Sequence, residues 1–197
     1  MESKGEHTGE LNNPDLSIIC NNCLGGFIYQ YYNIEYRTPT LGLFIPAVHY
    51  VKFLKDIKLY LSKKLEFIKP EQSMDYESFK NRASMITFPI ARLGDIEVFF
   101  MHYKDEEEAS SKWYRRINKI RWDNLIVIMA ENESFNYEVL KEFDKLSFKN
   151  KVCFTKEEYP EIRSACCISE MRKTGSRWSA ESVMRYFDLT DFINNRK

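Results

Sequence analysis

The sequence predicts a layered α/β fold with a mostly parallel sheet and helices on both faces. Short apolar runs at 16–20, 96–103, 125–129 and 152–155 are typical of strands, and amphipathic segments separate them. The alternation of strand and helix indicates a parallel sheet with crossover helices. We therefore expect these four runs in one sheet, with at least two of them as parallel neighbours.

Helical periodicity is clearest between residues 48 and 64, where apolar residues recur along one stripe. Residues 105–121 have glutamates in their first turns and basic residues in their last turns, which complements the dipole of a helix. The remaining predicted elements are a strand at 41–45, helices at 137–146 and 179–187, and a closing segment at 187–193.

The chain is long enough to bury a core of its own, and we predict one domain behind a short tail. Residues 1–14 are polar and end at Pro14, so we expect them to form a flexible tail. Residues 15–197 then form a single α/β domain. The polar stretch 69–84 is where a boundary between two lobes could lie.

Composition argues against several classes of protein. The 29 basic and 29 acidic residues balance, which disfavours nucleic acid as a partner and attachment to an acidic membrane surface. No apolar segment approaches the ~18 residues of a membrane helix, and the polar start is unlike a signal peptide, so we expect a cytoplasmic protein. The 5 cysteines are expected to be free thiols. The aromatic fraction of 15% suits a packed core and also surfaces that contact sugar rings.

The first candidate site is the corner between the first predicted strand and its helix. Here Gly25 and Gly26 let the backbone pass close to a ligand, and the helix presents free amides and the positive end of its dipole. We predict that Asn22, Cys23, Gly25 and Gly26 bind the phosphates of a donor. The glycine spacing matches neither Gly-x-Gly-x-x-Gly nor a Walker loop, so a plain tight turn explains these residues equally well.

Two pairs of cysteines are candidates for a redox site and for a zinc site. Cys20 and Cys23 have the spacing of a thioredoxin-type redox pair, but we favour an unreactive pair of thiols. Cys166 and Cys167 are adjacent and lack the two-residue gap of a zinc site. We therefore expect no structural zinc.

The second candidate site follows Gly94. Asp95 and Glu97 are two residues apart at the start of a predicted strand, so both should point to one face. They could bind a divalent ion such as Mg²⁺ or act as acid and base. His102 ends the same run, where α/β proteins tend to place ligands. The alternatives are a turn residue for Asp95 and a packed histidine for His102.

Other polar groups carry weaker signals. His49 lies near a helix start. Arg172, Lys173 and Arg177 could meet a phosphate, although a solvated surface run is the favoured interpretation. The sequence has no Asp-x-Asp and no Gly-x-Ser-x-Gly.

Two stretches carry a more specific pattern: SIICNNCLGGFIYQYYNIEYRTPTLGLF and FPIARLGDIEVFFMHYKDEEEASSKWYRRINKIRWDNLIVIMAE. Together they resemble the bacterial exopolysaccharide biosynthesis protein family that is catalogued as a domain of unknown function, over roughly residues 16–150. The matching residues are Asn22, Cys23, Gly25, Gly26, Tyr36, Pro39, Thr40, Gly94, Asp95, Glu97, His102, Tyr103, Trp113, Arg116 and Asn118. Cys20 departs from the serine of that pattern, and Ser134-Phe135 departs from its Cys-Thr.

The resemblance implies an α/β protein of surface or capsular polysaccharide assembly. Such pathways use nucleotide-activated donors, so it implies a transferase that moves a sugar or polyol-phosphate group to a glycan acceptor, in peripheral association with a membrane assembly complex. His102 or a carboxylate would take a proton from the acceptor hydroxyl. The alternative is a non-catalytic glycan- or partner-binding protein of the same pathway, which gains support if Gly25 and Asp95 lie on opposite faces of the fold.

A further expectation concerns Cys23 and His102. In a doubly wound fold, the loops that follow both of their strands open at the carboxyl edge of the sheet, so the two side chains can share one cleft. Cys23 could then be a nucleophile with His102 as its base. We favour phosphate binding at this corner over covalent chemistry, because the paired glycines explain the turn without a reactive thiol.

Overall fold

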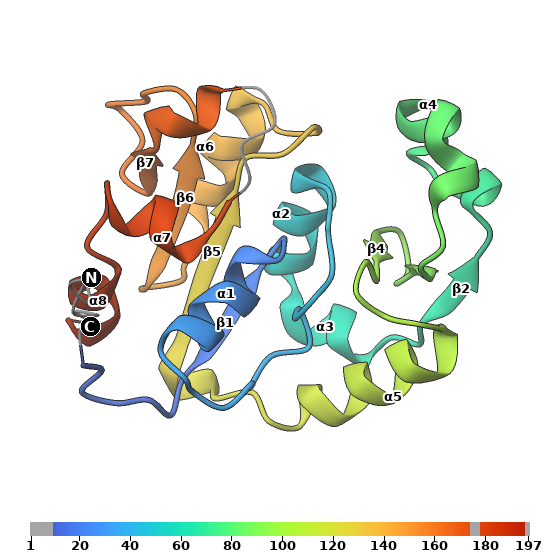
Figure 1. Ribbon diagram of the computed structural model, residues 1–197, viewed down its shortest axis with the longest axis horizontal. Coiled ribbons are helices and arrows are strands. Elements are labelled where there is room, and N and C mark those ends of the chain that lie inside the picture. The colour runs from blue at the N-terminus through green and yellow to red at the C-terminus, as the bar shows by residue number, and fades with distance from the viewer. Residues whose placement is uncertain (1–9, 174–177, 196–197) are drawn as a thin grey trace, which may run out of the picture.

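A computed structural model of the chain describes residues 10–173 and 178–195 and contains two sheets (Figure 1). The larger sheet has the order β1-β5-β6-β7, and all its neighbours are parallel. Its strands are β1 (Ser17–Cys20), β5 (Leu125–Ala130), β6 (Lys151–Thr155) and β7 (Ala165–Cys167). The predicted fold class is confirmed, and so are the strands expected at 16–20, 125–129 and 152–155.

The fourth expected strand belongs to a different sheet. An antiparallel sheet contains β2 (Glu66–Ile68), β3 (Ile90–Arg92) and β4 (Glu97–Phe99), with β3 in the centre. The prediction that 96–103 joins the parallel sheet is therefore wrong. Gly94 has φ +69°, and Leu93 N donates to Ile96 O at 2.9 Å, so the chain turns back at once and β4 pairs with β3.

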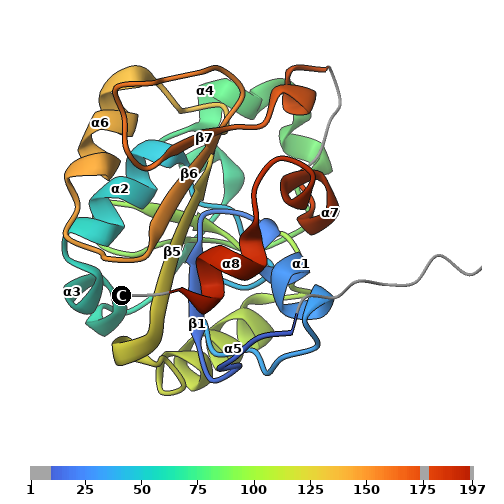
Figure 2. The same ribbon diagram turned by 90° about the vertical axis from the view of Figure 1, so that its left-hand side faces the viewer.

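Helices cover both faces of the parallel sheet (Figure 2). One face carries α1 (Leu24–Tyr31), α7 (Ala180–Met184) and α8 (Leu189–Asn194). The other face carries α2 (Ala47–Lys55), α3 (Ile57–Ser62) and α6 (Tyr137–Lys145). The helix α5 (Glu106–Ile117) packs through Trp113 on Phe100, which follows β4. Alternate strand residues divide between the two cores: Ile18 packs with α1, and Ile19 packs on the opposite side. The core that contains Ile19 also includes Val98 and Phe100, so this core joins the two sheets.

Local sequence explains the helix boundaries. The predicted helix at 48–64 is two helices, because Asp56 (φ −143°, ψ 58°) breaks it and then caps α3 through Leu59 N at 3.3 Å. The helices predicted at 105–121 and 137–146 are confirmed, capped by Asp105 and Asn136 respectively. The run at 41–45 forms only an isolated bridge, between Phe44 and Phe99.

The polar stretch 69–84 lies between β2 and β3. It forms the short helices η1 (Pro70–Gln72), α4 (Tyr76–Phe79) and the start of η2 (Lys80–Met85). Two further short helices are η3 (Trp122–Asn124) and η4 (Ser169–Arg172). The stretch is thus an insertion inside the antiparallel unit.

The described part of the predicted tail is held against α8. Asn12 N donates to Asn194 Oδ1 at 2.8 Å, and Asn194 Nδ2 donates to Glu10 O at 2.9 Å. Residues 1–9 of the predicted tail lie outside the described residues. In the part of the chain that is described, no helix combines the length and apolar character needed to cross a membrane.

A linking segment, residues 38–45, connects the two sheets. Phe44 and Phe99 exchange backbone hydrogen bonds of 2.8 and 2.9 Å, while Ile45 N donates to Asn21 O at 2.8 Å. The segment therefore lies between the end of β1 and β4. This arrangement places the residues that follow β4 beside the corner between β1 and α1.

Candidate functional site

Cys23 and His102 are in direct contact. His102 Nε2 lies 3.1 Å from Cys23 Sγ, and the imidazole can accept the thiol proton or donate to the sulfur according to its tautomer. Cys23 is the residue before the first turn of α1, and His102 follows β4. The expected shared cleft is confirmed, but by another route, because β4 is not part of the parallel sheet and reaches this corner through the linking segment.

Gly42 in the linking segment holds His102 in place. His102 N donates to Gly42 O at 3.0 Å. Gly42 has φ +70°, and a Cβ at this position would lie 3.3 Å from the Cβ of His102. A glycine is therefore required here both for the backbone conformation and for the close approach of the histidine.

The Cys23–His102 pair opens into a cavity of about 300 Å³, which we call the thiol cavity. It is also lined by Gly26, Tyr103, Lys112 and Arg116, among others. None of its described lining residues is a carboxylate, and its basic side chains are Arg116 and Lys112, of which Lys112 pairs with Glu108. The cavity is therefore suited to an anionic group.

The two cations of the thiol cavity are held differently. Arg116 Nη1 donates to the hydroxyl of Tyr103 at 2.6 Å, and this hydroxyl donates to Leu41 O at 2.6 Å. Lys112 pairs with Glu108 and lies 5.6 Å from the centre of the Tyr103 ring. Within residues 10–173 and 178–195 Arg116 forms no ion pair, so its charge is available to a ligand.

Burial sets the pKa of the two thiols at the corner between β1 and α1. It raises the pKa of the Cys23 thiol, so His102 is the group that can remove its proton. Burial also raises the pKa of Cys20 to about 12, against the opposing effect of the Asn22 and Gly25 amides. Cys20 therefore stays protonated, which supports the interpretation that it does not form a redox pair with Cys23. All five cysteines are free.

The four predicted phosphate-binding residues do not all line one cavity. Cys23 and Gly26 line the thiol cavity. Asn22 Oδ1 accepts from Leu24 N, the first amide of α1, at 3.0 Å. A Cβ on Gly25 would lie only 2.8 Å from the Cβ of Cys20, so Gly25 serves the packing of α1 on β1.

Asp95 lies away from this cavity. It is exposed in the turn before β4, accepts from the Tyr60 hydroxyl at 2.7 Å and pairs with Lys52 at 2.5 Å. The hydrogen bonds from Lys52 and Tyr60 lower the pKa of its carboxyl group to about 2. Since α2 and α3 supply these partners, Asp95 and Gly25 belong to opposite faces of the parallel sheet. One active site cannot use both corners.

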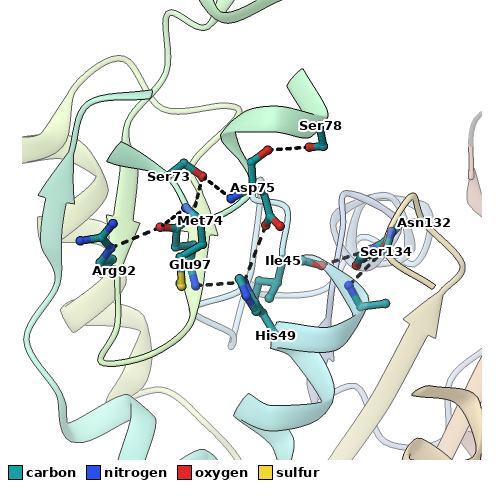
Figure 3. Close-up of polar contacts among 11 residues, drawn as sticks. Ile45, His49, Ser73, Met74, Asp75, Ser78, Arg92, Glu97, Asn132 and Ser134 are labelled. Carbon is teal, nitrogen blue, oxygen red and sulfur yellow. Dashed lines mark hydrogen bonds and ion pairs between the residues drawn. The ribbon is translucent and has the colours of Figure 1, made fainter. Parts of the chain in front are cut away.

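Glu97 is fully buried and holds the turn at residues 73–75 (Figure 3). It accepts from Ser73 Oγ at 2.6 Å, from Met74 N at 3.0 and 3.1 Å, and from Arg92 Nε at 3.3 Å. The expected placement of Asp95 and Glu97 on one face of a strand is not formed, because Asp95 belongs to the turn. Asp95 and Glu97 therefore bind different partners.

Sequence reasoning missed Asp75 and undervalued His49. His49 Nδ1 accepts from Glu97 N at 3.2 Å and lies 4.0 Å from Asp75 Oδ2 (Figure 3). That oxygen has no hydrogen-bond partner among the described residues. Burial raises the pKa of the Asp75 carboxyl, with His49 acting in the opposite direction. No sequence pattern marked Asp75, because it lies in a stretch that reads as a polar connection.

Asp75 lines a second cavity of about 590 Å³, which we call the sheet-edge cleft. One wall is the carboxyl edge of the parallel sheet: Asn22 follows β1, Glu131 and Asn132 follow β5, and Lys156 follows β6. After β1 the chain enters α1 on one face, and after β5 it enters α6 on the other. The cleft therefore lies at the topological switch point, where open α/β sheets bind ligands.

The two cavities adjoin one another. Three short segments contribute one residue to each cavity. Asn22, Phe44 and Met101 line the sheet-edge cleft, and their neighbours Cys23, Gly42 and His102 line the thiol cavity. The same three short segments therefore contribute to the lining of both cavities.

The remaining candidates have structural partners. Arg172 donates to Lys156 O at 2.8 Å and pairs with Glu157 at 2.9 Å, which fits a surface role, while Arg177 lies outside the described residues. Among the residues that the structure describes, no three His, Cys, Asp or Glu side chains are grouped so that they could hold a metal ion.

Comparison with known proteins places the chain in one family. The family described as "Domain of unknown function (DUF1919)" matches residues 2–194. The chain is also similar to an "Uncharacterized protein" of Haemophilus influenzae, with 30% identity over 189 residues that cover 93% of this chain and 85% of the relative.

Proposed function

The chain belongs to the DUF1919 family, and we propose that it is a transferase of bacterial exopolysaccharide or capsular polysaccharide biosynthesis. In this proposal it moves a sugar or polyol-phosphate group from a nucleotide-activated donor to a glycan acceptor. The observation that carries the proposal is the 3.1 Å contact of His102 with Cys23 inside a cavity that also contains Arg116. The resemblance of the two quoted stretches to exopolysaccharide proteins supplies the pathway, which we place in the cytoplasm beside a membrane assembly complex.

The basic side chains of the thiol cavity suit a donor phosphate. Arg116 is oriented by Tyr103 and can present two N–H groups to phosphate oxygens, whereas Lys112 is paired with Glu108. Gly26 lines the same cavity at the amino end of α1, where a side chain would otherwise restrict access. We therefore assign the leaving phosphate to this end of the cavity.

His102 is the group that would move the proton. It takes the proton of the acceptor hydroxyl, and the hydroxyl oxygen forms the new bond to the transferred group. The bond between that group and the leaving phosphate breaks, and the phosphate keeps the electron pair beside Arg116. Cys23 positions the imidazole in this scheme through its contact with Nε2.

The same contact favours a second candidate, acyl transfer through Cys23. The thiol would give its proton to His102, and the sulfur would attack the carbonyl carbon of an acyl donor and form a thioester, while the bond to the donor's leaving group breaks and that group takes the proton from His102. His102 would then take the proton of an acceptor hydroxyl, whose oxygen attacks the thioester carbon. The sulfur would leave and receive this proton from His102. Because burial raises the pKa of the Cys23 thiol, this chemistry depends on the histidine.

A third candidate is a non-catalytic glycan- or partner-binding protein. The separation of Gly25 from Asp95 favours it over an enzyme whose active site would use both corners. The transferase proposal therefore relies on the thiol cavity alone. Asp95, held by Lys52 and Tyr60, and Glu97, fully buried, have no part in it.

The proposal is tested by thermal-shift measurements with nucleotide-sugars and nucleotide-activated polyols, each with and without Mg²⁺. At least one donor should stabilise the protein, and Arg116→Ala should abolish that shift. Arg115→Ala is the matched control, because Arg115 is the exposed neighbour on the same helix and does not line the cavity. A complete lack of stabilisation, or equal shifts in both variants, would contradict donor binding in the thiol cavity.

A further inference from the structure

The sheet-edge cleft differs from the thiol cavity in both size and charge. Its volume of about 590 Å³ falls within the range of roughly 300–1,000 Å³ that is typical of small-molecule sites. It lies at the switch point between β1 and β5, where ligands of α/β sheets bind. No part of the transfer step described above uses it.

The charges of the cleft disfavour an anionic ligand. Three carboxylates line it, from Asp75, Glu131 and Glu133, against two cations, from Arg82 and Lys156. Each cation faces a carboxylate: Lys156 lies 3.7 Å from Glu131, and Arg82 lies 3.8 Å from Glu133. Among the described lining residues, none is a cation without a carboxylate partner. The phosphates of a nucleotide would therefore meet repulsion here, unlike in the thiol cavity.

The opposite wall of the cleft is aromatic. Phe44 and Phe79 both pack edge-on against Phe99, with ring centres 5.9 and 6.0 Å from it, and all three line the cleft. Aromatic side chains present a negative face that attracts the weakly positive C–H groups of a sugar ring. The wall therefore suits a ring that has C–H groups on its faces and hydroxyls at its edge.

Asp75 provides the polar contact for such a ring. Its side chain is 34% exposed, so the carboxyl group is open to a ligand on one side while Oδ2 is buried without a hydrogen-bond partner. The oxygen on the open side of the carboxyl group can accept a hydrogen bond from a ligand hydroxyl. His49 Nδ1 lies 4.0 Å from Oδ2, but it already accepts from Glu97 N and so leaves this oxygen unpaired among the described residues (Figure 3).

We propose that the sheet-edge cleft binds a neutral carbohydrate, with the ring against the partly exposed Phe79 and a hydroxyl on Asp75. Its role as the acceptor glycan rests on the proposed transferase function, because the cleft adjoins the thiol cavity at Asn22 and Met101. The binding itself does not depend on that function.

The test is saturation-transfer NMR with the full chain and a panel of neutral sugars: methyl hexosides, their N-acetylated forms, lactose, maltose and cellobiose. Glucuronic acid and UMP serve as anionic probes. At least one neutral sugar should bind, and Asp75→Asn should weaken that binding by about tenfold, the loss expected for one hydrogen bond to a charged acceptor. Glu77→Gln is the matched control, because Glu77 is exposed on α4 and does not line the cleft.

The outcomes separate this inference from the transferase proposal. Neutral-sugar binding that survives Arg116→Ala and falls with Asp75→Asn or Phe79→Ala supports the inference, even if every nucleotide donor fails to bind. Donor binding in the thiol cavity without any neutral sugar in the cleft overturns the inference alone. Displacement of a bound neutral sugar by UMP in the Arg116→Ala variant would also overturn it, because the nucleotide would then occupy the cleft.

Discussion

His102 Nε2 lies 3.1 Å from Cys23 Sγ, although 79 residues separate them in the chain. Two features create this contact. The linking segment bonds to the end of β1 through Ile45 and to β4 through Phe44, and Gly42 then allows His102 to fold close against it. The pair is therefore positioned by backbone contacts and by the lack of a side chain at Gly42.

Substitution of the pair distinguishes the two transfer mechanisms. Once a donor is identified, His102→Ala should lower turnover by about 10²-fold or more, the contribution usual for a general base. If His102 takes the proton of the acceptor hydroxyl and the donor phosphate leaves, Cys23→Ser keeps most of the activity, because Cys23 only positions the imidazole. The measurement is the initial rate of each variant, with its melting temperature as the folding control. Loss of turnover in Cys23→Ser and Cys23→Ala with folding preserved would make the thioester scheme the better account.

The reactivity of Cys23 should follow its raised pKa. Iodoacetamide reacts with the thiolate, and a raised pKa lowers the thiolate fraction at any given pH. The midpoint of the alkylation rate against pH should therefore lie above that of the same cysteine in the urea-unfolded chain. Cys20 and Cys153 are fully buried, have raised pKa values and should not react in the folded protein. A midpoint below the unfolded value would indicate a thiolate stabilised by protonated His102.

Asp75→Asn should stabilise the fold at neutral pH. Burial raises the folded-state pKa of this carboxyl above its ordinary value of 3.8, so the folded state binds the proton more tightly than the unfolded state. The ionised form therefore costs stability once the pH exceeds 3.8, and the full cost is present above the folded pKa. Urea unfolding should show the variant as more stable at pH 7, with the gain vanishing below pH 3.8. A less stable variant at pH 7 would mean that the contact with His49 outweighs burial.

Gly25 and Gly26 offer a matched pair of substitutions. Gly25→Ala would place a Cβ 2.8 Å from the Cβ of Cys20, a rigid neighbour, and should cost about 1–3 kcal/mol through overpacking. Gly26→Ala meets only the end of the Leu41 side chain, at 3.1 Å, and alanine favours a helix by up to ~1 kcal/mol. It should therefore be close to neutral for stability. Equal free energies of unfolding for the two variants would show that α1 does not pack on β1 as described.

Local patterns allowed much of the fold to be predicted. The helix α5 follows from acid at its start, base at its end and the cap at Asp105, all within one stretch of sequence. The parallel strands follow from uninterrupted apolar runs between helices. The sheet that contains β4 could not be predicted, because its membership depends on the positive φ of Gly94 and on pairing through β3 with β2, a distant and short strand.

The candidate site was only partly predictable for the same reason. Cys23 and His102 were expected together, but from a topology that the antiparallel sheet replaces. Asp75 gains its environment from His49 and Glu97, which come from other elements, so its own segment gave no signal. Contacts between segments that are far apart in the chain decide which polar residues share a cavity.

The measurement that tests the central claim most directly is protection of Cys23 from alkylation, followed by mass spectrometry of its peptide. The account predicts that a saturating nucleotide-activated donor, chosen by its thermal shift, slows iodoacetamide modification of Cys23 in the native chain and has no such effect in Arg116→Ala. Modification of the partly exposed Cys167 serves as the internal control and should be unchanged. Unaltered modification of Cys23 at a donor concentration that stabilises the protein would contradict the assignment of the donor to the thiol cavity.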